Sequence, residues 1–308
     1  MAALALAGCA VAPSIDATRP LLRDTEHRFY VYSDRNERTQ GDILASLVLL
    51  GGLSQRYGNS DSDCHGTECR KAFSDAFGEL GAEYARLGLD RLSLRYYELA
   101  LANTPESADK HVDLAIAQLS LGRDEAAIAS LGKAIGIAKG DADTERAAAG
   151  ILLLLDRPQE AIGHAEACIR QSPPPRAAQY CALTAMAAKL RGGSDSLVAP
   201  LVGGDAWPAP LLDYLRGNID EESLAKVIAS TADPALRREG LSEALYYVGE
   251  AELARGHRDL ALRYFRANLV MKVEGYWETT ASRRRIIQLG GGDDPPEDSP
   301  PPSHIPIG

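Results

Sequence analysis

Apolar and small residues recur along the middle of the chain with the spacing of amphipathic helices. In the segment 74–107, the first half carries them at i, i+3, i+4 and i+7, namely at Phe77, Leu80, Gly81 and Tyr84. This is the pattern of one helical face. Gly88 interrupts it, and a second amphipathic stretch ends before Pro105. The pattern predicts two helices joined by a short turn.

The same unit recurs with a step of 34 residues. Equivalent small or turn positions are Leu80, Leu114 and Ala148; Gly88, Gly122 and Asp156; Ser93, Ala127 and Ala161; and Ala100, Ala134 and Cys168. Small residues at such positions let paired helices approach closely. A period of 34 residues is typical of the tetratricopeptide repeat, whose helix pairs stack into a solenoid. We therefore predict an all-α tetratricopeptide-repeat solenoid, a fold that usually presents a protein-binding surface.

The repeat pattern fails between Arg191 and Leu241, where glycine and proline interrupt the helical periodicity, and then returns out of phase. An irregular helical interruption is therefore expected before the last repeat. The predicted segments are a truncated lipoprotein signal at 1–9, a tether at 10–41, an N-terminal helical segment with a cysteine loop at 42–73, three repeats at 74–175, a divergent repeat with irregular helices at 176–241, the last repeat and a capping helix at 242–289, and a disordered acidic, Pro-rich tail at 290–308.

Composition and charge narrow the class of protein. The chain has 308 residues, of which 45% are hydrophobic, which is enough for an extended helical core. Its formal net charge is −10, so it repels phosphate backbones and nucleic-acid binding is not expected. The apolar run Ile43 to Leu53 is too short to span a bilayer and is predicted to form a buried helix before the repeats.

The N-terminus resembles the end of a bacterial lipoprotein signal. Leu6-Ala7-Gly8-Cys9 matches the lipobox, in which the cysteine receives a diacylglycerol, so Cys9 is the predicted lipidation site. The alternative is an apolar start that happens to contain a cysteine. The apolar run is short and lacks a preceding Lys or Arg, which indicates a true start upstream of Met1. Ala10 rather than Asp after the cysteine favours the periplasmic face of the outer membrane, with the lipid as the only membrane attachment.

Export would give the other four cysteines a structural meaning. Cys64 and Cys69 bracket a small polar loop, for which a local disulfide is our first interpretation. A metal site that includes His65 is the alternative, although three ligands within six residues would be crowded. Cys168 and Cys181 lie on successive predicted helices, where a bridge and two buried thiols are equally compatible with the sequence.

Residues with catalytic spacing are missing from the chain. The six histidines are scattered, and no Gly-x-Ser-x-Gly, His-Glu-x-x-His or phosphate-binding glycine loop occurs. His164 and Cys168 stand one helical turn apart, but Cys168 occupies a packing position of the repeat and His164 is expected to face solvent. We predict no catalytic, cofactor-binding or metal-binding residues, and no enzyme activity.

A binding groove is the functional feature that the repeat predicts. Solenoid curvature places the first helix of each unit on the concave side. The predicted lining is mostly small and aliphatic, and consists of Asp75, Ala82, Arg86, Asp109, Val112, Ile116, Leu119, Arg146 and Leu153. It lacks the Lys and Asn side chains that hold a C-terminal carboxylate, so an amphipathic helix or an extended apolar peptide is the expected ligand. Alternatively, the chain's own N-terminal helix or a second copy covers the groove.

Three segments carry a family resemblance: residues 84–89 (YARLGL), 214–224 (YLRGNIDEESL) and 241–249 (LSEALYYVG). They are similar to the NlpI family of bacterial lipoproteins, and the similarity covers about residues 74–289, including the interruption. The resemblance implies a homodimeric, outer-membrane-anchored periplasmic adaptor, which links a tail-specific protease to peptidoglycan hydrolases. The Cys64–Cys69 loop and the acidic tail depart from that family and leave the dimer contacts and the partner open. The alternative function is an outer-membrane assembly lipoprotein of the barrel-insertion or type IV pilus machinery.

Overall fold

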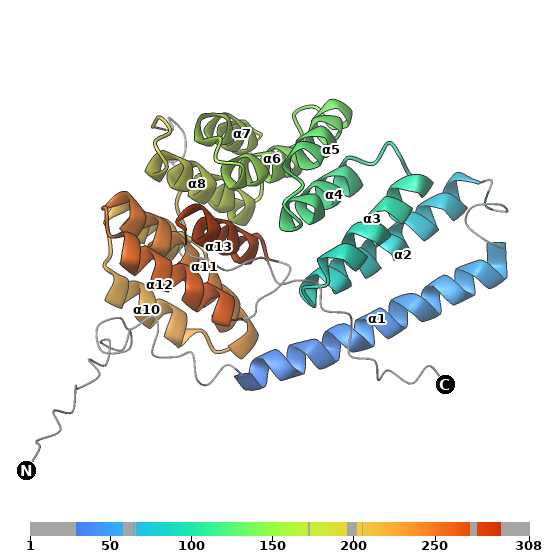
Figure 1. Cartoon of the computed structure of the whole chain (residues 1–308), viewed down its shortest axis with the longest axis horizontal. Coiled ribbons are helices and arrows are strands. Elements are labelled where there is room, and N and C mark those ends of the chain that lie inside the picture. Colours follow the sequence, from blue (N-terminus) through green and yellow to red (C-terminus); the bar gives the residue numbers. More distant parts are fainter. Residues whose placement is uncertain are drawn as a thin grey trace, which may run out of the picture.

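In a computed structural model of the chain, the structure describes residues 29–57, 64, 66–171, 173–195, 202–204, 206–271 and 276–290, with side chains from residue 41 onward. Over these residues the chain forms thirteen α-helices and no strand, which confirms the all-α prediction (Figure 1). They are α1 (Phe29–Tyr57), α2 (Thr67–Arg86), α3 (Asp90–Asn103), α4 (Ala108–Ser120), α5 (Asp124–Ile137), α6 (Ala142–Leu154), α7 (Pro158–Arg170), α8 (Pro175–Leu190), α9 (Ala209–Arg216), α10 (Glu221–Ser230), α11 (Pro234–Ala254), α12 (Arg258–Val270) and α13 (Trp277–Gln288). The predicted lipobox with Cys9, the first part of the tether and the tail from residue 291 lie outside the described residues.

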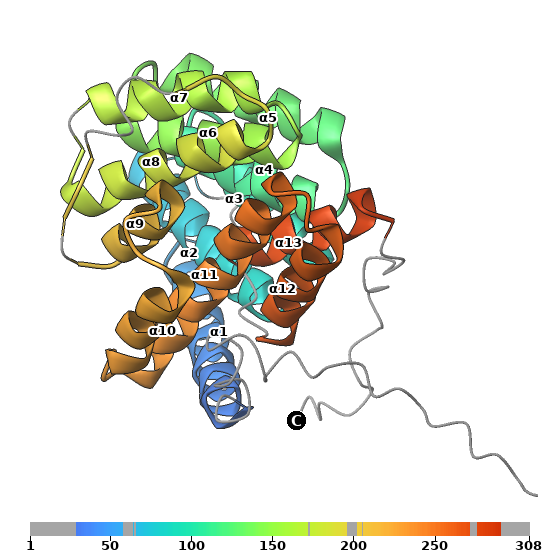
Figure 2. The same ribbon diagram turned by 90° about the vertical axis from the view of Figure 1, so that its left-hand side faces the viewer.

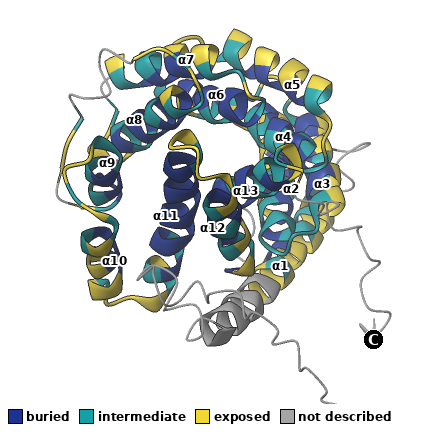
Figure 3. Cartoon of the chain, turned by 60° about the vertical axis from the view of Figure 1, so that its left-hand side comes forward, coloured by how far each residue is buried: buried dark blue, intermediate teal, exposed yellow. Residues whose placement is uncertain are grey.

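The repeats stack as successive helical hairpins. The pairs α2/α3, α4/α5 and α6/α7 pack side by side, and α8 continues the row against α7. The row curves, so that α4, α6 and α8 lie on its inner side and α3, α5 and α7 on its outer side (Figure 3). This is the curvature that the repeat predicts, with the first helix of each unit facing the concave side.

The 34-residue step locates the turns between paired helices. Gly122 has a φ of +68°, in the left-handed region, and Arg123 N donates to Gln118 O at 2.8 Å across the turn. Asp156 takes the equivalent place with a φ of +59°, and Arg157 N donates to Leu152 O at 2.9 Å. In both turns the residue after the left-handed position donates its backbone N–H to the carbonyl five residues earlier. This is the Schellman arrangement, which favours glycine at the left-handed position.

Small residues allow the close helix contacts. A side chain at Gly81 would place its Cβ 2.8 Å from the Tyr97 ring, and one at Gly249 would place it 2.6 Å from the Phe265 ring. Alanines at the equivalent repeat positions are buried completely, including Ala100, Ala127, Ala134 and Ala161. The paired helices therefore pack closely, with small residues on one helix leaving room for buried rings or backbone of the other.

The interruption differs in detail from the prediction. After α8 the short helices α9 and α10 follow one another and lead into α11 (Figure 2). Asp220 caps α10, with its carboxylate accepting from Ser223 N at 2.8 Å. α11, however, begins at Pro234 rather than at the predicted residue 242. Asp233 explains this earlier start, because it accepts from Ala235 N at 2.7 Å and precedes a proline, the favoured residue of a first helical turn.

The N-terminal segment also requires correction. Helix α1 begins at Phe29, inside the predicted tether, and α2 begins at Thr67 rather than near residue 74. The apolar run from Ile43 is not buried, since Leu44 and Val48 are 63% and 68% exposed. Only the inner face of α1 packs, where Leu50 and Leu53 contact the cluster around Phe73. Among the residues that the structure describes, no second layer covers the outer face of α1 (Figure 1).

Two disulfides join the described cysteines in pairs. Cys64 is bonded to Cys69 at the start of α2, so these thiols are not metal ligands. Cys168 of α7 is bonded to Cys181 of α8, and both are completely buried. The second bridge fastens α8 to the regular repeats at the point where the irregular segment begins.

The C-terminal helices α11, α12 and α13 fold back against the concave side of the solenoid. Every residue of α11 from Leu241 to Glu252 is buried, which places α11 at the centre of the main core (Figure 3). Helix α12 pairs with α11, and α13 then turns back and contacts both α4 and α6 on the concave side. The capping helix therefore lies within the groove of the solenoid.

Candidate functional site

Helix α13 occupies part of the predicted groove and is fixed there by polar contacts. Arg284 donates to both carboxylate oxygens of Asp124 at 2.7 Å and to Leu154 O at 3.1 Å, and the hydroxyls of Ser120 and Thr280 lie 3.3 Å apart. The element that covers part of the groove is thus the C-terminal helix α13. The sequence-based alternative named the N-terminal helix or a second copy of the chain instead.

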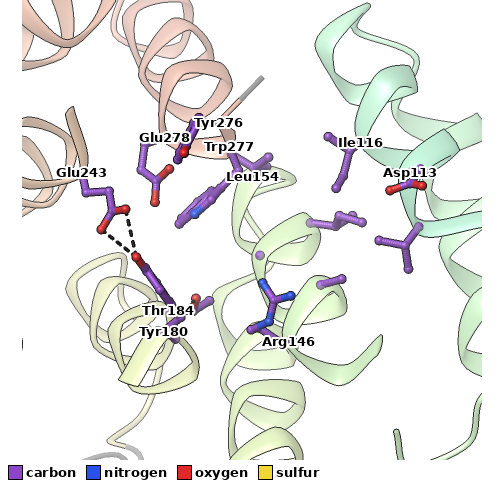
Figure 4. Close-up of a pocket in the computed structure, with 14 residues that line it drawn as sticks. Asp113, Ile116, Arg146, Leu154, Tyr180, Thr184, Glu243, Tyr276, Trp277 and Glu278 are labelled. Atoms are coloured by element: carbon purple, nitrogen blue, oxygen red, sulfur yellow. Dashed lines mark hydrogen bonds between the residues drawn. The ribbon is translucent and has the colours of Figure 1, made fainter. Parts of the chain in front are cut away.

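A cleft remains between α13 and the concave helices. Its larger cavity has a volume of about 410 Å³, and its smaller cavity has one of about 230 Å³. The two share Asp113, Ile116 and Tyr276, so they form one continuous depression along α13. The cleft therefore has one wall from the regular repeats and another from the C-terminal helices (Figure 4).

The predicted groove residues have three different fates. Val112, Ile116 and Arg146 line the larger cavity, and Ala82, Arg86 and again Ile116 line the smaller one. Asp75 and Asp109 are exposed to solvent outside both cavities, and Asp75 pairs with Lys71. Asp75 of α2 and Asp109 at the start of α4 therefore do not contribute to the cleft.

The prediction that Leu119 and Leu153 line the groove is wrong. They are 1% and 0% exposed and belong to the main core instead of the groove lining. Each lies four residues after a completely buried alanine, Ala115 or Ala149. Because residues four apart share one helical face, both leucines point into the packed seam between helices.

Several cleft residues were not predicted from the sequence. Tyr180 and Thr184 come from α8, Glu243 from α11, and Trp277 and Glu278 from α13. None belongs to the regular repeats, so the 34-residue register gives no information about them. Figure 4 shows Glu243, Glu278 and Trp277 on the side of the cavity opposite Ile116 and Asp113.

Burial determines the protonation of the cleft carboxyls. Glu243 accepts hydrogen bonds from Tyr180 Oη at 2.9 Å and from Trp207 Nε1 at 2.9 Å, yet burial raises its pKa to about 7. Burial, together with the neighbouring Glu243, raises the pKa of Glu278 well above its ordinary range. Burial also raises the pKa of Asp113 to about 6, against the opposing effect of Lys110. Removing a carboxylate from water disfavours its charged form, which is the common cause.

An ion-pair network lies behind the cleft. Glu250 of α11 accepts from Arg191 at the end of α8 and from Arg285 of α13, with contacts of 2.7 Å to each. Arg191 also donates to Tyr246 Oη at 2.8 Å. The two guanidinium groups hold the pKa of Glu250 at about 2 despite its burial. This network fastens α13, and so fixes the wall of the cleft.

The described residues provide little for metal or membrane binding. No group of three His, Cys, Asp or Glu side chains among them is arranged to hold a metal ion. His164 is bonded through Nδ1 to Glu145 at 2.6 Å, and the neighbouring Cys168 is in a disulfide. No helix in the described part of the chain is long and apolar enough to cross a membrane.

No protein-family model matches the chain, and no curated protein matches it. Among solved structures, the crystal structure of PilW, a widely conserved type IV pilus biogenesis factor, is 18% identical with a TM-score of 0.38, over 63% of this chain and 90% of PilW. The PilF protein of Pseudomonas aeruginosa is also 18% identical with a TM-score of 0.38, over 73% of this chain and 95% of PilF. At these values the comparison identifies neither a partner nor an activity for this chain.

Proposed function

We propose that the protein is a non-enzymatic scaffold that binds partner proteins in the cleft between α13 and the concave helices. The observation that carries this proposal is the composition of the cleft. Val112, Ile116 and Leu154 meet Tyr276 and Trp277 there, which makes a concave and largely apolar surface with aromatic side chains. Concave surfaces of this kind bind apolar or amphipathic peptide segments, with buried aromatic residues as anchors.

Helix α13 illustrates how a partner helix would sit on the concave side. It presents Trp277 to the core and uses Arg284 to reach Asp124, the first residue of α5. A partner segment that lies beside α13 would contact α4 and α6 in the same way. The expected partner segment therefore combines apolar anchors with a few polar residues.

For the biological role we propose a lipid-anchored adaptor on the periplasmic face of the outer membrane. Cys9 would carry the lipid, the protein would be a homodimer, and the cleft would hold a tail-specific protease or a peptidoglycan hydrolase. Holding both on one anchored scaffold raises their effective concentration and so regulates cell-wall turnover. This finer proposal rests on the resemblance of residues 84–89, 214–224 and 241–249 to the NlpI family.

The test is capture of partner proteins from periplasmic extracts by the tagged protein. Two variants carry the same isoleucine-to-arginine change, one in the cleft and one on the outer side of the solenoid. Ile116→Arg places a charge in the cleft, whereas Ile128→Arg places the same charge at a 40%-exposed position of α5 on the outer side. We expect Ile116→Arg to lose a protease or hydrolase that the wild type and Ile128→Arg retain. Equal capture by both variants would contradict a role for the cleft.

Deletion of the gene separates the two roles that the sequence allows. Accumulation of a cell-wall endopeptidase supports the adaptor, and loss of pili or porins supports the assembly lipoprotein instead. Zymography of purified protein on cell-wall substrate should show no clearing, and clearing would overturn the non-enzymatic assignment.

A further inference from the structure

Two buried glutamates lack the cationic partner that the others have. Among the described residues the buried glutamates are Glu83, Glu145, Glu243, Glu250, Glu252 and Glu278. Four of them are paired with arginine or histidine at 2.5–2.7 Å, in the pairs Glu83–Arg86, Glu145–His164, Glu250–Arg191 and Glu252–Arg255. No ion pair joins Glu243 or Glu278 within the described part of the chain. Both of these line the same cavity.

This exception is informative because buried charges in proteins are normally paired. Glu243 has only neutral donors, the Tyr180 hydroxyl and the Trp207 indole. Glu278 is 2% exposed, and Figure 4 shows its carboxyl directed toward the space between Glu243 and Trp277. The Tyr247 hydroxyl is completely buried without a hydrogen-bond partner among the described residues, and Glu278 is the charged group that acts on it most strongly.

The walls of the cavity suit the stem of a long cationic side chain. Ile116 of α4 and Leu154 of α6 line it from the concave helices, and Tyr276 and Trp277 line it from the start of α13. Arg146 also lines this cavity, but Figure 4 places its guanidinium on the side away from the two glutamates. A side chain that enters between these walls reaches two buried carboxyls with which no cation in the described part of the chain forms an ion pair.

We propose that this cavity is an anchor pocket for an arginine side chain of the partner protein. The guanidinium lies between Glu243 and Glu278, and the methylene stem packs on Trp277 and Tyr276. Arginine is favoured over lysine because its planar group pairs with two carboxylates at once, stacks on aromatic rings and is more weakly hydrated. The proposal rests on the scaffold function and names the chemistry of the partner.

Binding in this pocket is coupled to protonation. The groups that act on the two carboxyls are Arg176 and Tyr180 of α8, Glu239, Tyr246 and Tyr247 of α11, Trp207 before α9, and Trp277 of α13. Arg176 is the one cation in this set. A bound guanidinium favours the ionised carboxylates, so binding releases protons. The affinity therefore rises as the pH increases from about 5 to about 8.

The experiment titrates the full chain with three small probes and follows tryptophan fluorescence. The probes are Nα-acetyl-arginine amide, its neutral isostere Nα-acetyl-citrulline amide, and Nα-acetyl-lysine amide. The two tryptophans of the chain, Trp207 and Trp277, both border the acid pair and report on it directly. We expect the arginine probe to bind at least about tenfold more tightly than the citrulline and lysine probes.

Variants separate binding from folding. Glu278→Gln should weaken the arginine probe by at least about tenfold without lowering the melting temperature, because the amide needs no counter-ion. Glu222→Gln, at a solvent-exposed position of α10, should leave binding unchanged. The proposal would be overturned if the arginine probe does not bind, or if the citrulline probe binds equally well. It would also be overturned if arginine binding survives Glu278→Gln or does not depend on pH. Lysine binding as tight as arginine binding would overturn the choice of a guanidinium.

The outcome is distinguishable from failure of the scaffold function. If partners are captured through the cleft but the arginine probe does not bind, only the arginine pocket is refuted. If the probe binds but Ile116→Arg and Ile128→Arg capture the same proteins, the pocket is retained and the scaffold role of the cleft is refuted.

Discussion

Replacing Glu250 by glutamine should destabilise the protein strongly, because this carboxylate is the centre of the network that fastens α13. Its side chain is 1% exposed and accepts from Arg191 Nε at 3.0 Å, Arg191 Nη2 at 2.7 Å, Arg285 Nε at 2.7 Å and Arg285 Nη2 at 2.8 Å. Arg191 is 2% exposed and Arg285 is 12% exposed. Glu250→Gln keeps the size of the side chain but leaves both guanidiniums without their counter-ion.

The magnitude follows from the protonation of Glu250. The two arginines lower its pKa from 4.5 to about 2. This interval corresponds to about 3 kcal/mol of preference for the ionised form in the folded protein. Removing one partner of a buried ion pair typically costs about 3–5 kcal/mol. We therefore expect Glu250→Gln to lower the free energy of unfolding by about 3 kcal/mol at neutral pH.

Urea denaturation followed by far-UV circular dichroism measures this loss, with Glu222→Gln as the exposed control. The control should unfold at the wild-type urea concentration. Since the folded pKa of Glu250 is depressed, its contribution is present above about pH 4.5 and is lost as the pH falls through about 2. A loss below about 1 kcal/mol at neutral pH, or a difference that does not shrink on acidification, would refute this account of the network.

Thermal denaturation of five variants tests the packing and the acid pair. Glu278→Gln should become progressively more stable than the wild type as the pH rises from about 5 to about 8, because the raised pKa of Glu278 makes its ionisation costly; a constant difference would contradict this. Gly249→Ala should cost about 1–3 kcal/mol through overlap with the Phe265 ring, and Phe265→Leu in the same chain should recover part of that loss. Gly122→Ala should lower the free energy of unfolding by about 1 kcal/mol because the φ of Gly122 is positive. Gly132→Ala, in the exposed interior of α5, should raise it by about 1 kcal/mol. A change of the same sign in both variants would exclude backbone conformation as the cause.

Local periodicity explains why the regular part of the fold could be predicted. The 34-residue step places Gly122 and Asp156 at the turns, and the helical period places Val112, Ile116 and Arg146 on the concave side. These properties depend only on neighbours within one repeat. Asp233-Pro234 carries an equally local signal for the start of α11, which the prediction passed over in favour of the repeat register.

The rest of the cleft depends on tertiary packing that no local pattern contains. Glu243 and Trp277 reach Ile116 only because α11 and α13 fold back inside the curve of the solenoid. Leu119 and Leu153 were misplaced for a related reason, since the width of the packed seam is set by the neighbouring helices. The outer face of α1 was misjudged because burial of Leu44 would need a second layer that the described chain lacks.

The central claim is that the cleft beside α13 is where a partner protein docks. The most direct measurement is site-specific photo-crosslinking in cells, with the crosslinking residue placed at Ile116 in the cleft or at Ile128 on the outer side. The account predicts a discrete crosslinked partner at position 116, identified by mass spectrometry, that is missing at position 128. The same partner at both positions, or none at position 116, would contradict it.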